Sequence, residues 1–303
     1  MIDVIKYVVD FMKLREFDSE AIEALSGDIE KIYSDNKAKE FFEECIATYE
    51  SDINTDYRQM LDKADRAGES AGVHEYSAEL LLLICLTKPL RTEYAKRGLP
   101  DESWFDTTCS LKWSAMECKL VKGMYGSFVA DWLTGFFNMT RFELGRLQFE
   151  IDHLKFDHVV RGKLIKAGEL AIAIHIPRNN RPLTPESRMD SYRRAVALFK
   201  DMFDGKPVLF SCYSWLLSEE IRPMLKEGSN LQIFYDDFDL VRFDRHEKGE
   251  YPDAWRLFGM DCTGNVDDYP EDTSLRKAYK SYIKSGKIAS TGLGFFFADD
   301  VIG

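Results

Sequence analysis

The sequence predicts an α+β protein in which a helical domain is followed by a domain that alternates strands and helices. A chain of 303 residues commonly forms two domains, since a single hydrophobic core of that size is unusual. Apolar residues spaced i, i+3, i+7 and i+10 from Ile22 to Ile32 lie on one helix face, and similar patterns fill roughly the first 135 residues. From about residue 138 onward, strand-like runs alternate with single helices. We therefore expect domains at 1–135 and 136–303.

The first domain is predicted to contain a series of helices separated by short polar breaks. Asp18 and Ser19 are candidate caps for the helix that contains Ile22–Ile32, and Pro89 is expected to kink a later helix. The other expected helices cover 1–14, 36–50, 56–69, 74–97 and 101–122.

The second domain begins with the run FELGRLQFEI at 142–151, whose alternation of apolar and polar residues slips by one position. A strand with a bulge at Gly145-Arg146 would explain the slip. Further strands are expected at 170–177, 208–213, 231–243 and 294–301, and helices at 185–203, 218–226 and 273–285.

The net charge of −12 is concentrated in the first part of the chain. Residues 1–80 hold 20 Asp and Glu against 9 Lys and Arg, whereas the remainder holds 32 against 31. Such acidity argues against nucleic acid as a partner of the N-terminal half, because phosphate binding requires cations. The alternative interpretation is an ordinary solvated acidic helix surface.

Other sequence features exclude several classes of protein. No apolar run approaches the length of about 18 residues that spans a membrane. The N-terminus has no basic region before its apolar residues and no small-residue cleavage site, so we expect no signal peptide and a cytoplasmic protein. The six cysteines form no C-x-x-C pair and indicate reduced thiols, and neither they nor the five histidines form a metal-ligand pattern.

The stretch AIAIHIPRNNRPLT at 171–184 is the strongest candidate for a functional site. In the predicted strand, one face is large and apolar, while the other carries Ala171, Ala173 and His175. Small side chains on that face allow a helix or a ligand to approach the backbone closely.

The loop that follows leads into a helix with a clear start. Thr184 can cap it, and Pro185 suits its first position. Free N–H groups at such an end attract anions, above all phosphates, and Arg178, Arg181 and Arg188 add positive charge. Alternatively, Glu186 already satisfies the helix dipole and the arginines are solvated. The loop has no glycine, which weakens a P-loop or Rossmann interpretation.

The second half of the chain resembles the C-terminal domain of a family of GNAT-like N-acyltransferases that carry a helical N-terminal domain. The segments that carry the resemblance occur in the family's order over about half of the chain: LGRLQFE (144–150), IAIHIPRNNRPLTPES (172–187), SCYSWLL (211–217), SNLQIF (229–234), EDTSLRKAY (271–279) and GLGFFF (292–297). The resemblance implies a mixed, splayed β-sheet flanked by helices, with acetyl-CoA or another acyl-CoA bound between two strands.

The resemblance also implies roles for individual residues. In GNAT proteins the CoA pyrophosphate lies on the loop between a central strand and the next helix, where the usual pattern is Arg/Gln-x-x-Gly-x-Gly/Ala; this chain has RNNRPLT instead. The residues expected to bind the cofactor are Ile176, Arg178, Asn179, Asn180, Arg181 and Thr184. Many GNAT enzymes protonate the leaving thiolate with a tyrosine from a later helix. The expected helix 218–226 has none, so Tyr213 is the nearest substitute.

Transfer of an acetyl or short acyl group to an amine also requires a base. His175 is the candidate, because a neutral imidazole is available near pH 7; the alternative is a structural histidine. Glu143 and Glu150 are candidates for holding the amine of a small-molecule or peptide acceptor. Two other functions remain open: a thiol enzyme that uses Cys212 with His175, and a catalytically inactive acyl-CoA-binding or regulatory module.

Overall fold

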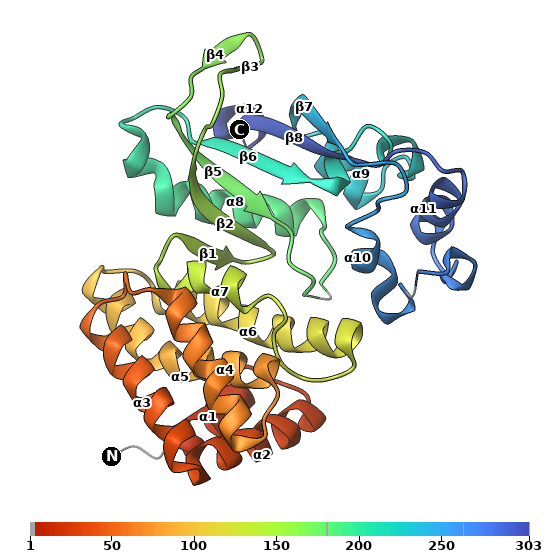
Figure 1. Ribbon diagram of the computed structural model, residues 1–303. Coiled ribbons are helices and arrows are strands. Elements are labelled where there is room, and N and C mark those ends of the chain that lie inside the picture. Colours follow the sequence, from red (N-terminus) through yellow and green to blue (C-terminus); the bar gives the residue numbers. More distant parts are fainter. Residues whose placement is uncertain (1–3, 180, 263, 303) are drawn as a thin grey trace. The chain divides into compact units, whose positions relative to one another are not determined.

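The computed structural model describes residues 4–179, 181–262 and 264–302, and its contacts divide the chain into two units (Figure 1). The first unit is Met1–Glu143 and the second is Leu144–Gly303. An α+β chain with a helical N-terminal region and a mixed sheet is confirmed. The domain boundary near residue 135 stays a prediction.

The first unit consists of helices and contains the start of one strand. The helices are α1 (Val4–Leu14), α2 (Ser19–Ser34), α3 (Asn36–Ser51), α4 (Tyr57–Ala71), α5 (Glu75–Lys96), α6 (Asp101–Lys122) and α7 (Ala130–Phe137). The central helix is α5, against which the other six helices pack; its run Leu80–Leu86 is buried. Pro89 lies inside α5, which continues beyond it to Lys96. Side-chain caps fix several helix starts: Asp35 accepts from the Ala38 amide at 2.8 Å.

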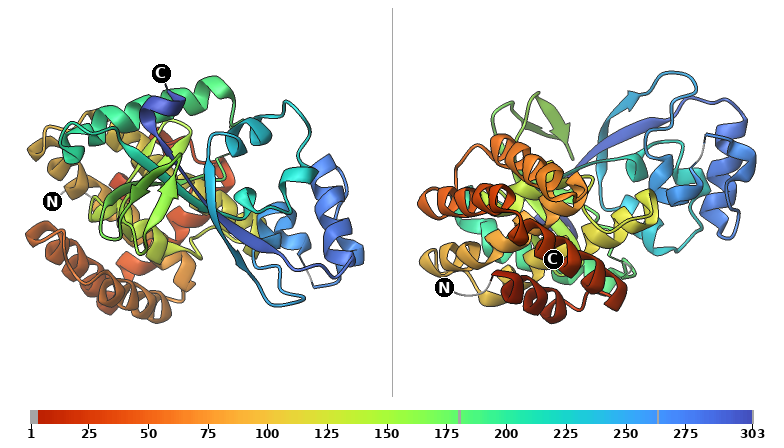
Figure 2. Two further views of the ribbon diagram at one scale, coloured as in Figure 1. Left: turned by 90° about the horizontal axis from the view of Figure 1, so that it is seen from above. Right: turned by 60° about the horizontal axis from the view of Figure 1, so that its bottom comes forward.

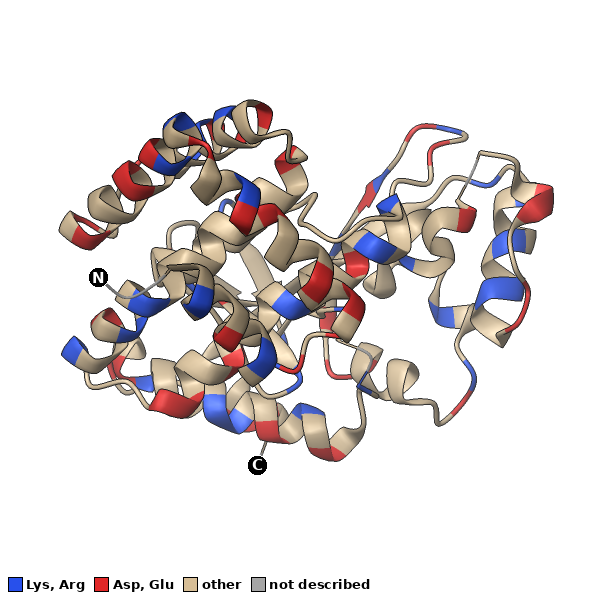
Figure 3. Ribbon diagram, turned by 90° about the horizontal axis from the view of Figure 1, so that it is seen from below, with Lys and Arg blue, Asp and Glu red and all other residues tan. Residues whose placement is uncertain are grey.

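The acidic excess of the first unit is spread over its helices. Figure 3 shows acidic and basic residues interspersed along them. Ion pairs at helical spacing join Lys6 to Asp10 and Lys31 to Asp28. This distribution agrees with a solvated helix surface.

No helix in the described part of the chain has the length and apolar character needed to cross a bilayer.

The second unit is built on a mixed sheet with strand order β2–β5–β6–β8–β7. Its strands are β2 (Leu147–His153), β5 (Leu170–His175), β6 (Leu209–Ser214), β7 (Asp239–Arg245) and β8 (Ser290–Phe297). The pair β5–β6 is parallel, and the other neighbouring pairs are antiparallel. The strand β1 (Arg141–Leu144) crosses the boundary between the units. A separate hairpin, β3 (His158–Val160) and β4 (Lys163–Ile165), projects beyond the sheet in both Figure 1 and Figure 2.

One face of this sheet is covered by α8 (Pro185–Phe199), which continues as a 3₁₀ turn over Lys200–Phe203. The Tyr192 ring of α8 lies 5.8 Å from the Phe210 ring of β6 and 5.1 Å from the Phe296 ring of β8. Both phenylalanines are fully buried, so this aromatic layer holds α8 against the sheet. The remaining helices are α9 (Asn230–Tyr235), α10 (Ala254–Phe258), α11 (Ser274–Lys284) and α12 (Ala298–Val301).

Four sequence-based assignments in the second unit were wrong. The last four residues of the expected strand 294–301 form α12, because β8 ends at Phe297. The run 142–151 is not one bulged strand but β1 and β2 joined by a turn, because Gly145 takes a positive φ of 70°. The region 218–226 forms no α-helix and contains only a 3₁₀ turn at Arg222–Met224. The first half of the expected strand 231–243 is α9, since the Ser229 side chain caps a helix by accepting from the Gln232 amide.

Candidate active site

The central parallel ladder between β5 and β6 is short. The two strands pair through Ile172–Phe210 and Ala173–Ser211, and the ladder ends there. Beyond this point β5 runs on to His175, where it stays paired with β2, and β6 runs on to Ser214, where it stays paired with β8. The carboxyl ends of the two strands therefore leave one another, which is the splayed arrangement that the family resemblance implied.

Both predicted catalytic side chains share one face of the sheet with Glu150. Residues directly opposite on neighbouring strands project from the same side, and Ala173 stands opposite both Glu150 and Ser211. Because side chains alternate along a strand, His175 and Tyr213 lie on this face as well. It is the face opposite α8, and we call it the polar face. The sequence pattern alone placed His175 there correctly.

On the polar face, the side chains of His175 and Glu150 are in hydrogen-bond contact. The Nε2 atom of His175 lies 2.9 Å from Oε2 of Glu150, and about a quarter of each side chain is exposed. A carboxylate accepts from Nε2–H and thereby orients the imidazole ring. The contact also stabilises the imidazolium form, so it suits a histidine that takes up a proton.

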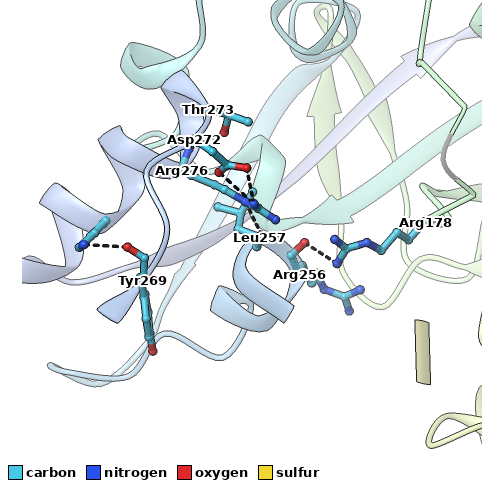
Figure 4. A network of polar contacts seen from close by, with 8 residues as sticks. Arg178, Arg256, Leu257, Tyr269, Asp272, Thr273 and Arg276 are labelled. Atoms are coloured by element: carbon cyan, nitrogen blue, oxygen red, sulfur yellow. Dashed lines mark hydrogen bonds and ion pairs between the residues drawn. The ribbon is translucent and has the colours of Figure 1, made fainter. Parts of the chain in front are cut away.

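The loop that leaves β5 is held by contacts at several points. Asn179 is 1% exposed, and its Oδ1 accepts from the Arg181 amide at 3.3 Å. Its Nδ2 is buried and has no hydrogen-bond partner among the described residues. Arg178 donates to the backbone carbonyl of Arg256 in α10 at 3.1 Å, as Figure 4 shows. Asn180, also expected to bind the cofactor, lies outside the described residues.

The same loop is anchored to the layer of helices that Figure 4 displays. Ile176 is half-buried and packs against a core cluster that includes Ala254 and Phe258 of α10. Arg276 of α11 donates to the carbonyl of Leu257, again in α10, at 2.8 Å. Loop, α10 and α11 are therefore linked by side-chain contacts.

At the N-terminus of α8, Thr184 acts as the predicted cap, since its hydroxyl accepts from the Ser187 amide at 3.2 Å. The carboxylate of Glu186 occupies the same helix end. Its own backbone N–H and the Thr184 hydroxyl hold its pKa below the ordinary value. Arg188 is buried and pairs with Asp237 at 3.2 Å, so it does not supply the surface charge that the sequence suggested. Arg181 is exposed.

Tyr213 is half-exposed near the end of β6. Its hydroxyl donates to Oδ2 of Asp244 at 3.1 Å, and the same oxygen accepts from Arg242 at 2.7 Å. Partial burial, followed by the contact with Asp244, raises the pKa of Tyr213. Its phenol therefore remains protonated at neutral pH.

Comparisons with known proteins decide the family. The model of the GNAT-like C-terminal domain matches residues 141–296, and the model of the N-acyltransferase N-terminal domain matches residues 7–139. The chain belongs to the GNAT-like N-acyltransferases. No curated protein matches the chain.

Solved structures agree with the GNAT-like fold. An acyltransferase variant in complex with octanoyl-CoA has a TM-score of 0.72 and 19% identity, over 95% of this chain and 86% of that chain. An acyltransferase in complex with decanoyl-CoA and teicoplanin has a TM-score of 0.72, and one in complex with CoA and 10C-teicoplanin has 0.73. Both are 19% identical, over 95% of this chain and 87% of theirs. At this identity the likeness concerns the fold.

Two of the alternatives from the sequence do not fit this GNAT-like structure. Cys212 is 1% exposed on the α8 side of the sheet, and burial raises the pKa of its thiol to about 12, so it is no nucleophile. Glu143 is 2% exposed in the first unit and accepts from the Ser110 hydroxyl at 2.5 Å, so its carboxylate is not open to an amine. No group of three or more potential metal ligands occurs among the residues that the structure describes.

Sequence reasoning missed two residues of this GNAT-like domain. Tyr235 ends α9, the first α-helix after β6 in the described chain, and it was hidden because its segment had been assigned to a strand. Arg146 was interpreted only as part of a bulge, but its side chain reaches the loop between β5 and α8. The slip in alternation at Gly145-Arg146 was the signal for a turn that could have placed it.

Proposed function

We propose that this protein is an acyl-CoA-dependent N-acyltransferase whose reacting groups meet on the polar face, where β5 and β6 part. The observation that carries the proposal is the contact of Glu150 with His175, which lies two residues beyond the end of the parallel ladder. It lies directly before a loop and a capped helix N-terminus suited to phosphate groups. The acyl-CoA complexes of the structural neighbours support the choice of co-substrate.

The loop supplies the binding groups in this proposal. Arg178 and Arg181 provide positive charge for the pyrophosphate, and the buried Nδ2 of Asn179 is a donor that a ligand oxygen would satisfy. Ile176 and Thr184 border the loop at its two ends. The thioester would enter where the ladder between β5 and β6 ends.

The chemistry follows from the geometry of the polar face. The imidazole of His175 accepts a proton from the acceptor amine, while Glu150 stabilises the resulting imidazolium. The amine nitrogen forms a bond to the thioester carbon, and the charge on the carbonyl oxygen is stabilised by backbone N–H groups at the strand end. The C–S bond then breaks, and the CoA thiolate takes a proton from Tyr213.

The acceptor in this proposal is a small molecule or peptide that carries an amine. The neighbours crystallised with teicoplanin support an acceptor larger than a simple amine, and those with octanoyl- and decanoyl-CoA support acyl groups longer than acetyl. One experiment tests the acceptor and the acyl chain length separately. Release of free CoA is measured from acetyl-, octanoyl- and decanoyl-CoA, each with a panel of polyamines, amino sugars and peptides.

Variants assign the roles. Glu150→Gln and His175→Ala should each lower kcat about 10²- to 10⁴-fold, with little change in the Kd of CoA. Tyr213→Phe should lower kcat, and its matched control Tyr235→Phe should leave kcat unchanged. The opposite result would assign the proton donor to Tyr235 of α9. Unchanged turnover in both His175→Ala and Glu150→Gln would remove the polar face from the mechanism.

An inactive acyl-CoA-binding module is the second candidate. It is favoured by the glycine-free loop and by the Glu186 carboxylate, which already occupies the helix N-terminus. Stabilisation by CoA without CoA release from any thioester, with any amine of the panel, would establish this candidate and exclude the enzyme.

A further inference from the structure

We infer that Arg146 is a positioning residue that holds the loop after β5 in its ligand-binding shape. This inference rests on the proposed function, since it assigns a role to a loop that the proposal makes the CoA site. The guanidinium reaches the loop at two points: Nη1 donates to the carbonyl of Pro177 at 3.0 Å, and Nε donates to the carbonyl of Arg181 at 2.8 Å. One planar group thereby joins two points four residues apart.

The base of this side chain is itself fixed on α8. The Arg146 amide donates to Oγ of Ser191 at 2.8 Å, and Ser191 is fully buried and donates in turn to the Ser187 carbonyl at 3.0 Å. Gly145, which precedes Arg146, has a φ of 70°, and a Cβ atom there would lie 3.0 Å from the Ser191 hydroxyl. The turn at Gly145-Arg146 is therefore packed closely against α8, and this contact fixes the position of the Arg146 backbone.

The clamp determines which backbone groups the loop presents. Because Arg146 binds the carbonyls of both Pro177 and Arg181, these two points of the loop are held at a fixed separation. A glycine-rich phosphate loop obtains its shape from glycine conformations, and this loop contains no glycine. Here, a side chain from the preceding hairpin supplies the constraint instead.

The positive charge of Arg146 contributes a second effect. The two hydrogen bonds hold the positive guanidinium against the loop, so a pyrophosphate bound to the loop would experience this charge at short range. Arg146 would thus act on CoA through the loop, and neither on the acceptor nor on the reacting atoms.

The test compares Arg146→Gln and Arg146→Lys with Arg193→Gln, which removes an exposed arginine of α8. Amide hydrogen exchange of residues 176–184 is measured first, without ligand. Exchange should rise in Arg146→Gln, rise less in Arg146→Lys, which can retain one contact, and stay unchanged in Arg193→Gln. The Kd for CoA should then weaken about tenfold in Arg146→Gln, the factor expected for one lost hydrogen bond from a charged group.

The kinetic readout separates positioning from a general loss of stability. In Arg146→Gln the KM for acyl-CoA should rise, while kcat and the KM for the acceptor stay near wild type. Unchanged loop exchange in Arg146→Gln would overturn the clamp, and faster exchange with unchanged CoA affinity would overturn its role in binding. Failure of the wild type itself to bind CoA would overturn the proposed function, and the exchange data would still decide whether the clamp exists.

Discussion

Replacing Arg188 by leucine should destabilise the second unit by an amount that depends on pH. The Nε atom of Arg188 lies 3.2 Å from Oδ2 of Asp237, and the two side chains are 5% and 10% exposed. Tyr192 donates to the same carboxylate oxygen at 3.1 Å. Burial outweighs the attraction of Arg188, so the pKa of Asp237 is raised to about 6.

The direction of the pH effect follows from that pKa. In the unfolded chain the carboxyl titrates near 3.8, and in the folded protein near 6. Its contribution to stability is therefore fully present below the unfolded pKa and is lost as the pH rises through 6, a change of about 3 kcal/mol at 1.36 kcal/mol per pKa unit. At pH 8 the carboxylate is charged and depends on Arg188.

The substitution Arg188→Leu should make the stability of the protein depend more strongly on pH. Loss of the partner of a buried charge costs about 3–5 kcal/mol, so Arg188→Leu should lose that much stability at pH 8. At pH 5, where Asp237 is largely protonated, the loss should be about 2 kcal/mol smaller, because a neutral carboxyl needs no counter-charge. Urea unfolding of wild type and variant at the two pH values measures both numbers.

The double variant Arg188→Leu/Asp237→Asn is the control. With no carboxylate left, its loss of stability should be nearly the same at pH 5 and pH 8. An equal loss at both pH values in the single variant Arg188→Leu would show that Asp237 is not charged in the folded protein at pH 8, and the reasoning would fail.

Three further substitutions test the packing of both units. Gly292→Ala should destabilise the second unit by about 3 kcal/mol or more, because a Cβ atom would lie 2.0 Å from the Leu217 carbonyl oxygen; Gly27→Ala, with no atom within 4 Å, should instead stabilise α2 by up to about 1 kcal/mol. Thermal unfolding measures both, and a tolerated Gly292→Ala would refute the close approach. Ile172→Ala should cost about 2–5 kcal/mol in urea unfolding, since the side chain is fully buried; a cost below 1 kcal/mol would mean that the site collapses around the smaller residue. In the native protein at pH 8, Cys212 should resist iodoacetamide while unfolded chains react, because its thiol is buried with a pKa of about 12; rapid native alkylation detected by mass spectrometry would contradict this.

The helices of the first unit could be predicted because their signals are local. Apolar periodicity and polar breaks lie within a few residues of the elements they specify, and most of the expected boundaries agree with the structure to within a few residues. The short helix α7 was not predicted, since eight residues give only two turns of periodicity. The β3–β4 hairpin was missed for the same reason, with strands of three residues each.

The errors in the second unit arose where one sequence pattern fits two structures. The apolar run at 231–235 suits a strand as well as a helix, and the cap from Ser229 decides in favour of the helix. Likewise, a slip in alternation at Gly145-Arg146 fits a bulge or a turn. The direction of the following strand, which depends on distant pairing with β5, decides in favour of the turn.

The site shows the same division between local and distant determinants. His175 at the strand end and Thr184 at the helix start were found from adjacent residues alone. The partner of His175, Glu150, lies 25 residues away and is brought near only by the antiparallel register of β2 and β5. Arg146 reaches a loop more than 30 residues later for a comparable reason.

In the proposed CoA site, the absence of glycine from the loop changes which residues control the affinity for CoA. In a glycine-rich loop the backbone itself approaches the phosphate, and side chains contribute little to its shape. Here the shape depends on Arg146, on the buried Asn179 and on the contact of Arg178 with α10. The carboxylate of Glu186 must also give way to an anion at the helix end. Affinity for CoA should accordingly vary with side chains outside the loop, which a search for phosphate-binding motifs along the sequence would overlook.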